Sequence, residues 1–149
     1  MTISELSKHF SEMKIAIRRT MDDDLPRIVG NKAASMFRKN FQDEGFFGRK
    51  WQEVKRRQNP KVKGADAHRK ILTGRTGNLG RSLQVTTGKG KAIITSDLPY
   101  SAAHNEGTSN AGRGRRTRIP QRQFMGGHPD IDRMVETEIG KAITRIIGK

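Results

Sequence analysis

The feature that most restricts the fold is a pair of short runs near the middle of the chain, residues 82–87 and 91–96, separated by Gly88-Lys89-Gly90. Leu83 and Val85 alternate with polar residues in the first run, and the second run is rich in isoleucine. This pattern is typical of a β-hairpin, because glycine adopts the backbone angles of tight turns without steric cost. A two-stranded hairpin is only marginally stable alone, so other elements must cover its apolar face.

Three segments with helical periodicity are available for that cover: Thr2–Thr20, Asp24–Glu44 and Asp130–Ile147. Their ends carry a capping-box sequence, a proline in a first turn, and charges that suit the helix dipole. We therefore predict a single α+β domain over residues 1–149, with a small, mainly antiparallel sheet built on the central hairpin. The second and third helices cover this sheet, and residues 1–20 form a helical arm.

Shorter elements are predicted between these. Residues 65–72 have the pattern of a short helix, and residues 100–106 that of about one helical turn. Residues 121–125, which follow a proline, are predicted to add an edge strand, and residues 126–129 to form a turn.

The composition argues for a polyanionic neighbour. Thirty lysines and arginines against fifteen aspartates and glutamates leave a formal net charge of +15, which favours contact with nucleic acid or an acidic protein surface. Hydrophobic residues make up only 32% of the chain, which predicts a lean core with mobile loops or with surfaces covered on assembly. No apolar run approaches the roughly 18 residues of a membrane span, so no membrane partner is predicted.

Two basic segments are candidates for contact with phosphate or carboxylate groups, although each could equally be a solvated loop. One begins with Lys55, Arg56 and Arg57. The other, residues 108–118, has no apolar side chain larger than alanine, so a long mobile loop is predicted there. The arginines of this loop are Arg113, Arg115, Arg116 and Arg118.

Phe46, Phe47 and Trp51 form an aromatic cluster in the N-terminal half. Such a cluster either fastens a loop to the core or serves as an anchor in a subunit interface, where aromatic residues concentrate. The sequence leaves both interpretations open.

Motifs of catalysis are not found. The chain has no cysteine, and its four histidines fall in different predicted elements without the spacing of a helical metal pair. Nucleotide-binding glycine patterns, a nucleophile elbow, an HExxH sequence and paired catalytic carboxylates are also missing. We therefore predict a protein that is not an enzyme and that has no catalytic residues, cofactor or metal.

The order of short motifs carries a family resemblance. Residues 76–83 read Thr-Gly-x-Leu-x-x-Ser-Leu and precede the predicted hairpin, and residues 99–107 read Pro-Tyr-Ser-Ala-Ala-His-Asn-Glu-Gly. After a variable loop, residues 119–126 read Ile-Pro-x-Arg-x-Phe-Met-Gly and lead to the terminal helix. Over residues 37–147 this order resembles the bacteriophage virion morphogenesis proteins, which include the tail-completion proteins of Mu-like phages.

The resemblance implies a structural virion protein of the neck or upper tail, which completes the tail and joins it to the head as part of a ring. The implied partners are copies of itself, with a hexamer expected from tail symmetry, and the tail tube, terminator and connector proteins. Assembly would take place in the bacterial host cytoplasm. The alternative is a free nucleic-acid-binding protein that acts through its basic surface.

Within this interpretation, the arginine loop either contacts genomic DNA in the head-to-tail channel, without reading its bases, or docks on an acidic neighbouring ring. Tyr100, Arg122 and Phe124 are expected to organise the fold, and Trp51 to act as an anchor.

Overall fold

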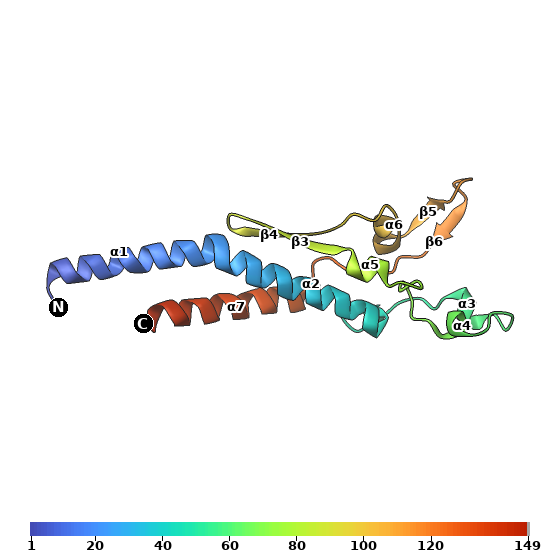
Figure 1. The fold of residues 1–149 in the computed structure, drawn as a ribbon, viewed down its shortest axis with the longest axis horizontal. Coiled ribbons are helices and arrows are strands. Elements are labelled where there is room, and N and C mark those ends of the chain that lie inside the picture. Colours follow the sequence, from blue (N-terminus) through green and yellow to red (C-terminus); the bar gives the residue numbers. More distant parts are fainter. Residues whose placement is uncertain (149) are drawn as a thin grey trace. The chain divides into compact units, whose positions relative to one another are not determined.

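The computed structural model describes residues 1–148 and has the predicted α+β architecture (Figure 1). The chain divides into two compact units. Unit 1 contains residues 1–33, residues 85–94 and the C-terminal segment from Pro129, and unit 2 contains residues 34–84 and 95–128. The strands form three separate two-stranded sheets.

The helices are α1 (Ile3–Arg19), the π-helical segment η1 (Thr20–Asp24), α2 (Leu25–Asp43), α3 (Lys55–Gln58), α4 (Ala65–His68), α5 (Asn78–Arg81), α6 (Ser101–Glu106) and α7 (Pro129–Ile147). The strands pair as β1 (Gly45–Phe46) with β2 (Arg49–Lys50), β3 (Leu83–Gly88) with β4 (Lys91–Ser96), and β5 (Thr108–Ala111) with β6 (Thr117–Ile119).

A proline explains the π-helical segment between α1 and α2. Pro26 has no N–H with which to reach the carbonyl of Asp22, four residues earlier. In η1 the N–H of Leu25 instead donates to the carbonyl of Thr20, five residues earlier. The carbonyl of Asp22 accepts the N–H of Gly90 at 3.1 Å, from the turn of the β3–β4 hairpin. The sequence places the end of the first helix near residue 20, but the helical run continues because the π turn accommodates the proline.

The predicted central hairpin is confirmed, and a glycine lets it approach α2 within unit 1. Strands β3 and β4 are joined by the two-residue turn Lys89-Gly90. A Cβ atom on Gly30 of α2 would lie 2.6 Å from Val85 Cγ1 and 3.0 Å from Ala92 Cβ. Only a residue without a side chain allows this close approach between helix and hairpin.

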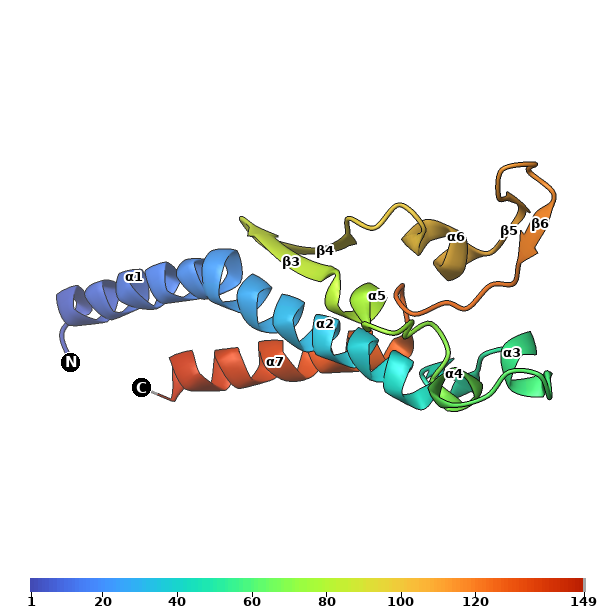
Figure 2. The same cartoon turned by 45° about the vertical axis from the view of Figure 1, so that its right-hand side comes forward.

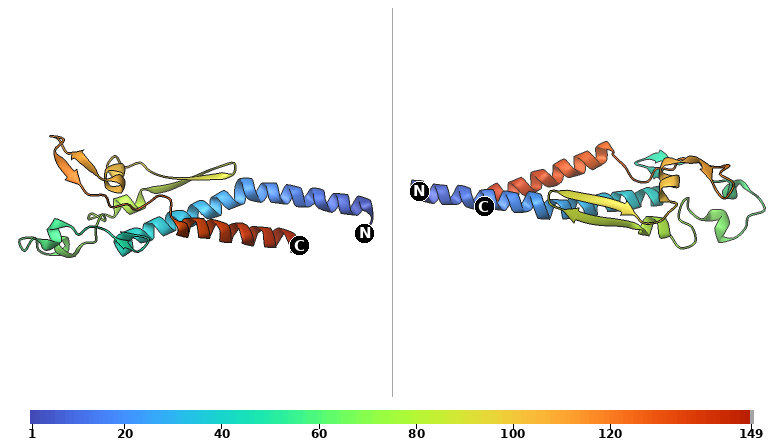
Figure 3. Two further views of the ribbon diagram at one scale, coloured as in Figure 1. Left: turned by 180° about the vertical axis from the view of Figure 1, so that it is seen from behind. Right: turned by 90° about the horizontal axis from the view of Figure 1, so that it is seen from above.

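The predicted C-terminal helix is confirmed as α7, which lies beside α1 in unit 1 (Figures 1 and 3). Glu138 of α7 is buried and forms ion pairs with Lys32 of α2 and, at 3.3 Å, with Lys141. The hydrogen bond from Lys32 is the main cause that lowers the pKa of Glu138, while desolvation acts in the opposite direction. This carboxylate therefore links two helices of unit 1.

The core of unit 2 is aromatic. Phe41 packs between Trp51, with ring centres 5.7 Å apart, and Phe124, with ring centres 5.0 Å apart. Phe37 and Phe46 are also buried. Burial of each such side chain contributes about 1.5–3 kcal/mol. The aromatic cluster of the sequence thus fastens the β1–β2 turn to the core of this unit.

The predicted edge strand over residues 121–125 is wrong, because side chains occupy its backbone groups. Asn105 Oδ1 accepts the N–H groups of Phe124 at 2.9 Å and Met125 at 3.1 Å. Asn40 Nδ2 donates to the carbonyl of Phe124 at 2.9 Å. The segment therefore pairs with amide side chains in place of a neighbouring strand.

The short helix predicted over residues 65–72 is confirmed only as the four-residue helix α4. The carbonyls of Arg69 and Lys70 accept hydrogen bonds from the guanidinium of Arg56, at 2.5 and 3.0 Å. The helix ends because the backbone of Arg69 turns out of the helical region, with φ −55° and ψ 138°, and the hydrogen bonds from Arg56 hold the chain beyond it.

Candidate functional site

Strands β5 and β6 form a hairpin, which we call the arginine hairpin (Thr108–Ile119), where the sequence predicts a long mobile loop (Figure 2). Thr108 pairs with Ile119, and Ala111 pairs with Thr117, with a register shift between them. Backbone hydrogen bonds do not require large apolar side chains, so the absence of such residues did not prevent pairing. The mobility of this segment stays a prediction.

All four arginines of the arginine hairpin are exposed. Among the described residues, their guanidinium groups have neither hydrogen-bond nor ion-pair partners. The sequence contains no acidic residue between Glu106 and Asp130. The hairpin therefore presents a concentrated positive charge that this stretch of the chain does not neutralise. Arg113, Arg115 and Arg116 lie in the connecting turn, and Arg118 lies in β6.

The base of the arginine hairpin is held by the chain on either side. Gly107 has a φ of 76°, and a Cβ atom there would lie 2.8 Å from the backbone nitrogen of Gln121. Three residues before Gly107, the carbonyl of His104 accepts the N–H of Arg122 at 2.8 Å. The hairpin is thus attached to α6 by close backbone contact.

Arg122 is buried, unlike the four arginines of the hairpin. Its Nε donates to the carbonyl of Gln52 at 2.9 Å, and its Nη2 to the carbonyl of Glu53 at 3.3 Å. Burial lowers the pKa of Arg122, while the charge of Glu53 acts in the opposite direction. Burial, followed by the positive charge of Arg122, also lowers the pKa of His104. Arg122 therefore forms its hydrogen bonds inside unit 2 and is not part of the exposed basic surface.

The other three residues expected to act as anchors lie in different surroundings. Phe124 is fully buried, and Trp51 is buried with its Nε1 donating to the carbonyl of Gln123 at 2.7 Å. Tyr100 is 43% exposed, and its ring packs edge-on against the ring of His104, with ring centres 6.1 Å apart. Trp51, Arg122 and Phe124 therefore belong to one interior cluster, whereas Tyr100 lies at the surface.

Two of the three basic residues that begin the other candidate segment are engaged inside unit 2. Arg56 donates to the carbonyl of Asp66 at 2.7 Å as well as to the ends of α4 described above. Arg57 Nη2 pairs with Glu44 Oε2 at 2.7 Å. Lys55 is exposed. The guanidinium groups of Arg56 and Arg57 thus already have backbone and carboxylate partners.

Helix α1 carries an apolar stripe (Ile3, Leu6, Phe10, Met13 and Ile17), which is exposed except at Met13, a half-buried residue that also lines the groove described below. These residues recur at alternating steps of three and four, which is the spacing of a coiled-coil seam. No residue of α1 is buried, and Ile3 and Phe10 are 88% and 59% exposed. The sequence predicts the helix but not the stripe as a candidate site, although the alternating spacing is a signal for it.

A groove of about 760 Å³ runs along the apolar side chains of α1, α2 and α7 within unit 1. Its apolar lining comes from all three helices, and charged residues lie along it. Its main apolar lining residues are Met13, Ala16, Ile28, Ala142 and Ile146. Unit 1 thus offers both a protruding apolar stripe and an apolar groove.

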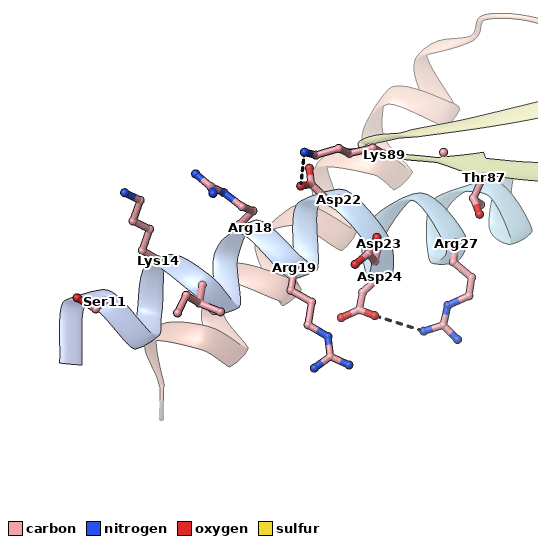
Figure 4. A pocket seen from close by; sticks show the side chains of 12 residues that line it. Ser11, Lys14, Arg18, Arg19, Asp22, Asp23, Asp24, Arg27, Thr87 and Lys89 are labelled. Carbon is pink, nitrogen blue, oxygen red and sulfur yellow. Dashed lines mark ion pairs between the residues drawn. The ribbon is translucent and has the colours of Figure 1, made fainter. Parts of the chain in front are cut away.

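A second, larger hollow of about 1110 Å³ lies where α1 and η1 meet the turn of the β3–β4 hairpin (Figure 4). Its acidic residues are partly paired: Asp22 lies 3.8 Å from Lys89, and Asp24 lies 3.5 Å from Arg27. Arg18 and Arg19 point to different sides of the helix (Figure 4). The charges of this hollow do not converge on one point, so we assign no ligand to it.

Among residues 1–148, no group of three or more histidine, cysteine or acidic side chains is arranged to hold a metal ion. The helices described there include none with the length and apolarity needed to cross a bilayer.

The protein combines an α+β fold with two surfaces, the apolar stripe and the arginine hairpin, that suit contact with other macromolecules. A family model described as the phage virion morphogenesis family matches residues 5–145. The chain belongs to this family, as its motif order predicts, and its role is that of a structural protein associated with the phage virion. Comparison with curated proteins and with solved structures gave no match.

Proposed function

We propose that the chain is a subunit of the neck or upper tail of a phage, where it completes the tail and joins it to the head as part of a ring. The observation that carries this proposal is the family match over nearly the whole chain. The exposed groups support an assembly role. The described residues present an apolar stripe and a basic hairpin to solvent, and their polar side chains do not converge on one point as they would around a small ligand.

The ring would form through unit 1. The apolar stripe of one subunit packs into the groove between α1, α2 and α7 of the next, with Ile3, Leu6 and Phe10 as anchors at helical spacing. Burial of each such side chain contributes about 1.5–3 kcal/mol, which offsets an association cost of about 4–15 kcal/mol. Because the anchors Ile3, Leu6 and Phe10 do not line the groove, the contact is heterologous. Repeated heterologous contacts close into a ring when the rotation permits.

The neighbours in this proposal are the tail tube or terminator protein on one side and the connector on the other. The net charge of +15 favours neighbours with acidic faces, whose association would then be sensitive to salt. Six subunits would match the symmetry generally expected of tails.

The proposal is tested by infection with a phage that carries a stop codon early in the gene for this chain. Electron microscopy of the lysate is expected to show filled heads and separate tails that have not joined. A stop codon suppressed by the host is the matched control and should restore complete particles. Complete, infectious particles in the absence of the chain would contradict the proposal.

The alternative, a free nucleic-acid-binding protein, is favoured by the unpaired arginines of the hairpin. It requires the isolated monomer to bind DNA tightly at physiological salt. Weak binding that falls steeply with salt would instead be expected of a virion subunit that meets DNA only after assembly.

A further inference from the structure

We propose that the arginine hairpin binds the phosphate backbone of duplex DNA without reading the base sequence. This goes beyond the structural role above, because it assigns a ligand to one hairpin of a single subunit and requires no ring.

The charge and chemistry of the hairpin fit phosphate. Each guanidinium is a planar group with five N–H donors that can bind phosphate through two parallel hydrogen bonds. The four arginines are exposed and unpaired among the described residues. Exposed Ser109, Asn110 and Thr117 add hydroxyl and amide groups of the kind that contact phosphate oxygens.

The shape of the hairpin fits a duplex. A two-stranded β-ribbon is narrow enough to enter the major groove of B-DNA. Gly114 at the tip has open space around it, and Gly112 begins the turn with a φ of 79°. Two positions without side chains let the backbone of the turn come close to a phosphate. The close backbone contact between Gly107 and Gln121 fixes the base of the hairpin before DNA binds. This reduces the conformational entropy lost on binding.

An acidic protein surface is the less suitable partner. Protein interfaces usually centre on buried aromatic or aliphatic anchors, surrounded by a polar rim. Residues 108–118 offer no apolar side chain larger than alanine. A contact made only of charges and small polar groups is more typical of binding to a nucleic-acid backbone.

The test is the salt dependence of binding to a fluorescent, random-sequence duplex DNA. Four phosphate contacts predict that log K falls against log salt with a slope of about −3.6. The variant R113Q/R115Q/R116Q/R118Q should lose more than about tenfold in affinity at moderate salt and most of that slope. The control K14Q/R18Q/R19Q/K91Q removes the same charge from exposed positions outside both basic segments and should change the slope by less than about one.

Three results would overturn the proposal. They are a wild-type slope shallower than about −2, equal losses in the two variants, or binding of wild-type protein to poly-glutamate as tight as to DNA. The last would indicate an acidic protein surface as the partner. Circular dichroism and light scattering on each variant report fold and assembly separately, so a failure of the ring proposal leaves the DNA measurement interpretable.

Discussion

Two asparagines hold the segment after the arginine hairpin by opposite chemistry. Asn40 uses its amide nitrogen to donate to the carbonyl of Phe124, and its oxygen accepts the N–H of Phe47 at 3.1 Å. Asn105 uses only its oxygen, which accepts the N–H groups of Phe124 and Met125. At position 40 the side chain must therefore include a hydrogen-bond donor, whereas at position 105 an acceptor oxygen is sufficient.

This difference predicts unequal responses to the same substitution. Asn40→Asp would place a carboxylate oxygen against the carbonyl of Phe124 in a buried site, so the free energy of unfolding should fall by about 2–4 kcal/mol at pH 7. Asn105→Asp keeps both hydrogen bonds, and we expect a change within about 1 kcal/mol. Urea denaturation of both variants measures this. Equal losses would show that the amide groups do not act as described.

Glu44 predicts a pH dependence of stability. Burial by itself raises the pKa of this carboxyl, but the hydrogen bonds from Arg57 and from the N–H of Ile71 outweigh it and leave the pKa below its ordinary value of 4.5. The unfolded chain therefore takes up a proton at a higher pH than the folded chain does. The stabilisation is present above pH 4.5 and is lost as the pH falls through the lowered pKa.

The substitution Glu44→Gln should therefore flatten the curve of unfolding free energy against pH between neutral and acidic conditions. The variant should be less stable than the wild type at pH 7, and the difference should shrink as the pH falls. Denaturant titrations at several pH values measure this. Asp97→Asn, at an exposed position, is the control and should keep the wild-type difference between pH values. A curve for Glu44→Gln parallel to the wild type would contradict the assignment.

At the scale of elements, the approach of the central hairpin to α2 depends on Gly30. Glycine-to-alanine substitution inside a helix ordinarily stabilises it by about 1 kcal/mol. At Gly30 the added methyl group would collide with Val85 and Ala92, so we expect a loss of about 1–3 kcal/mol instead. Thermal or urea unfolding of Gly30→Ala measures the sign of the change.

Gly140 of α7 provides the matched control, because a Cβ atom placed there would meet no atom within 4 Å apart from the adjacent residues and backbone of its own helix. Gly140→Ala should stabilise the protein by up to about 1 kcal/mol. The double variant Gly30→Ala/Val85→Ala should recover part of the loss. If both glycine substitutions stabilise the protein, the hairpin does not lie against α2 as described.

The elements that were predictable from the sequence are those with a local signal. The central hairpin follows from alternation around glycines, and α7 from an apolar stripe with suitable terminal charges. The π turn has a local cause in Pro26, but no local pattern shows that Gly90 of the hairpin turn donates to the carbonyl of Asp22. The edge strand failed because Asn40 lies 84 residues from its partner Phe124, and hydrogen bonds of that range leave no local pattern.

The candidate sites show the same limit. The sequence identified the four arginines of the hairpin, because a cluster of arginines carries a positive charge whatever conformation the segment adopts. It could not show that Arg56 and Arg57 are engaged by carbonyl groups and by Glu44, because free and paired arginines look alike in a sequence. Arg122 differs from Arg118 by only four positions, and burial alone separates their roles.

At the scale of the whole molecule, the apolar stripe predicts self-association. Multi-angle light scattering of the wild type should give a multiple of the 16.7 kDa chain mass. Ile3→Gln/Phe10→Gln should shift the protein toward a monomer, because it removes two anchors from the stripe without lowering helix propensity.

Ile143→Gln is the control for this experiment. Ile143 is 47% exposed on α7, and it belongs neither to the stripe nor to the lining of the groove. This variant should keep the wild-type mass. A monomeric wild type, or an equal loss of mass in both variants, would contradict assembly through the stripe.

The central claim, that the chain is a structural part of the virion at the head–tail junction, is tested most directly by where it is found. Gold-labelled antibodies against the chain, applied to purified particles and to isolated tails, should mark one end of the tail, at the neck. Particles and tails that both lack the chain, or label spread along the tail or over the head, would contradict the account.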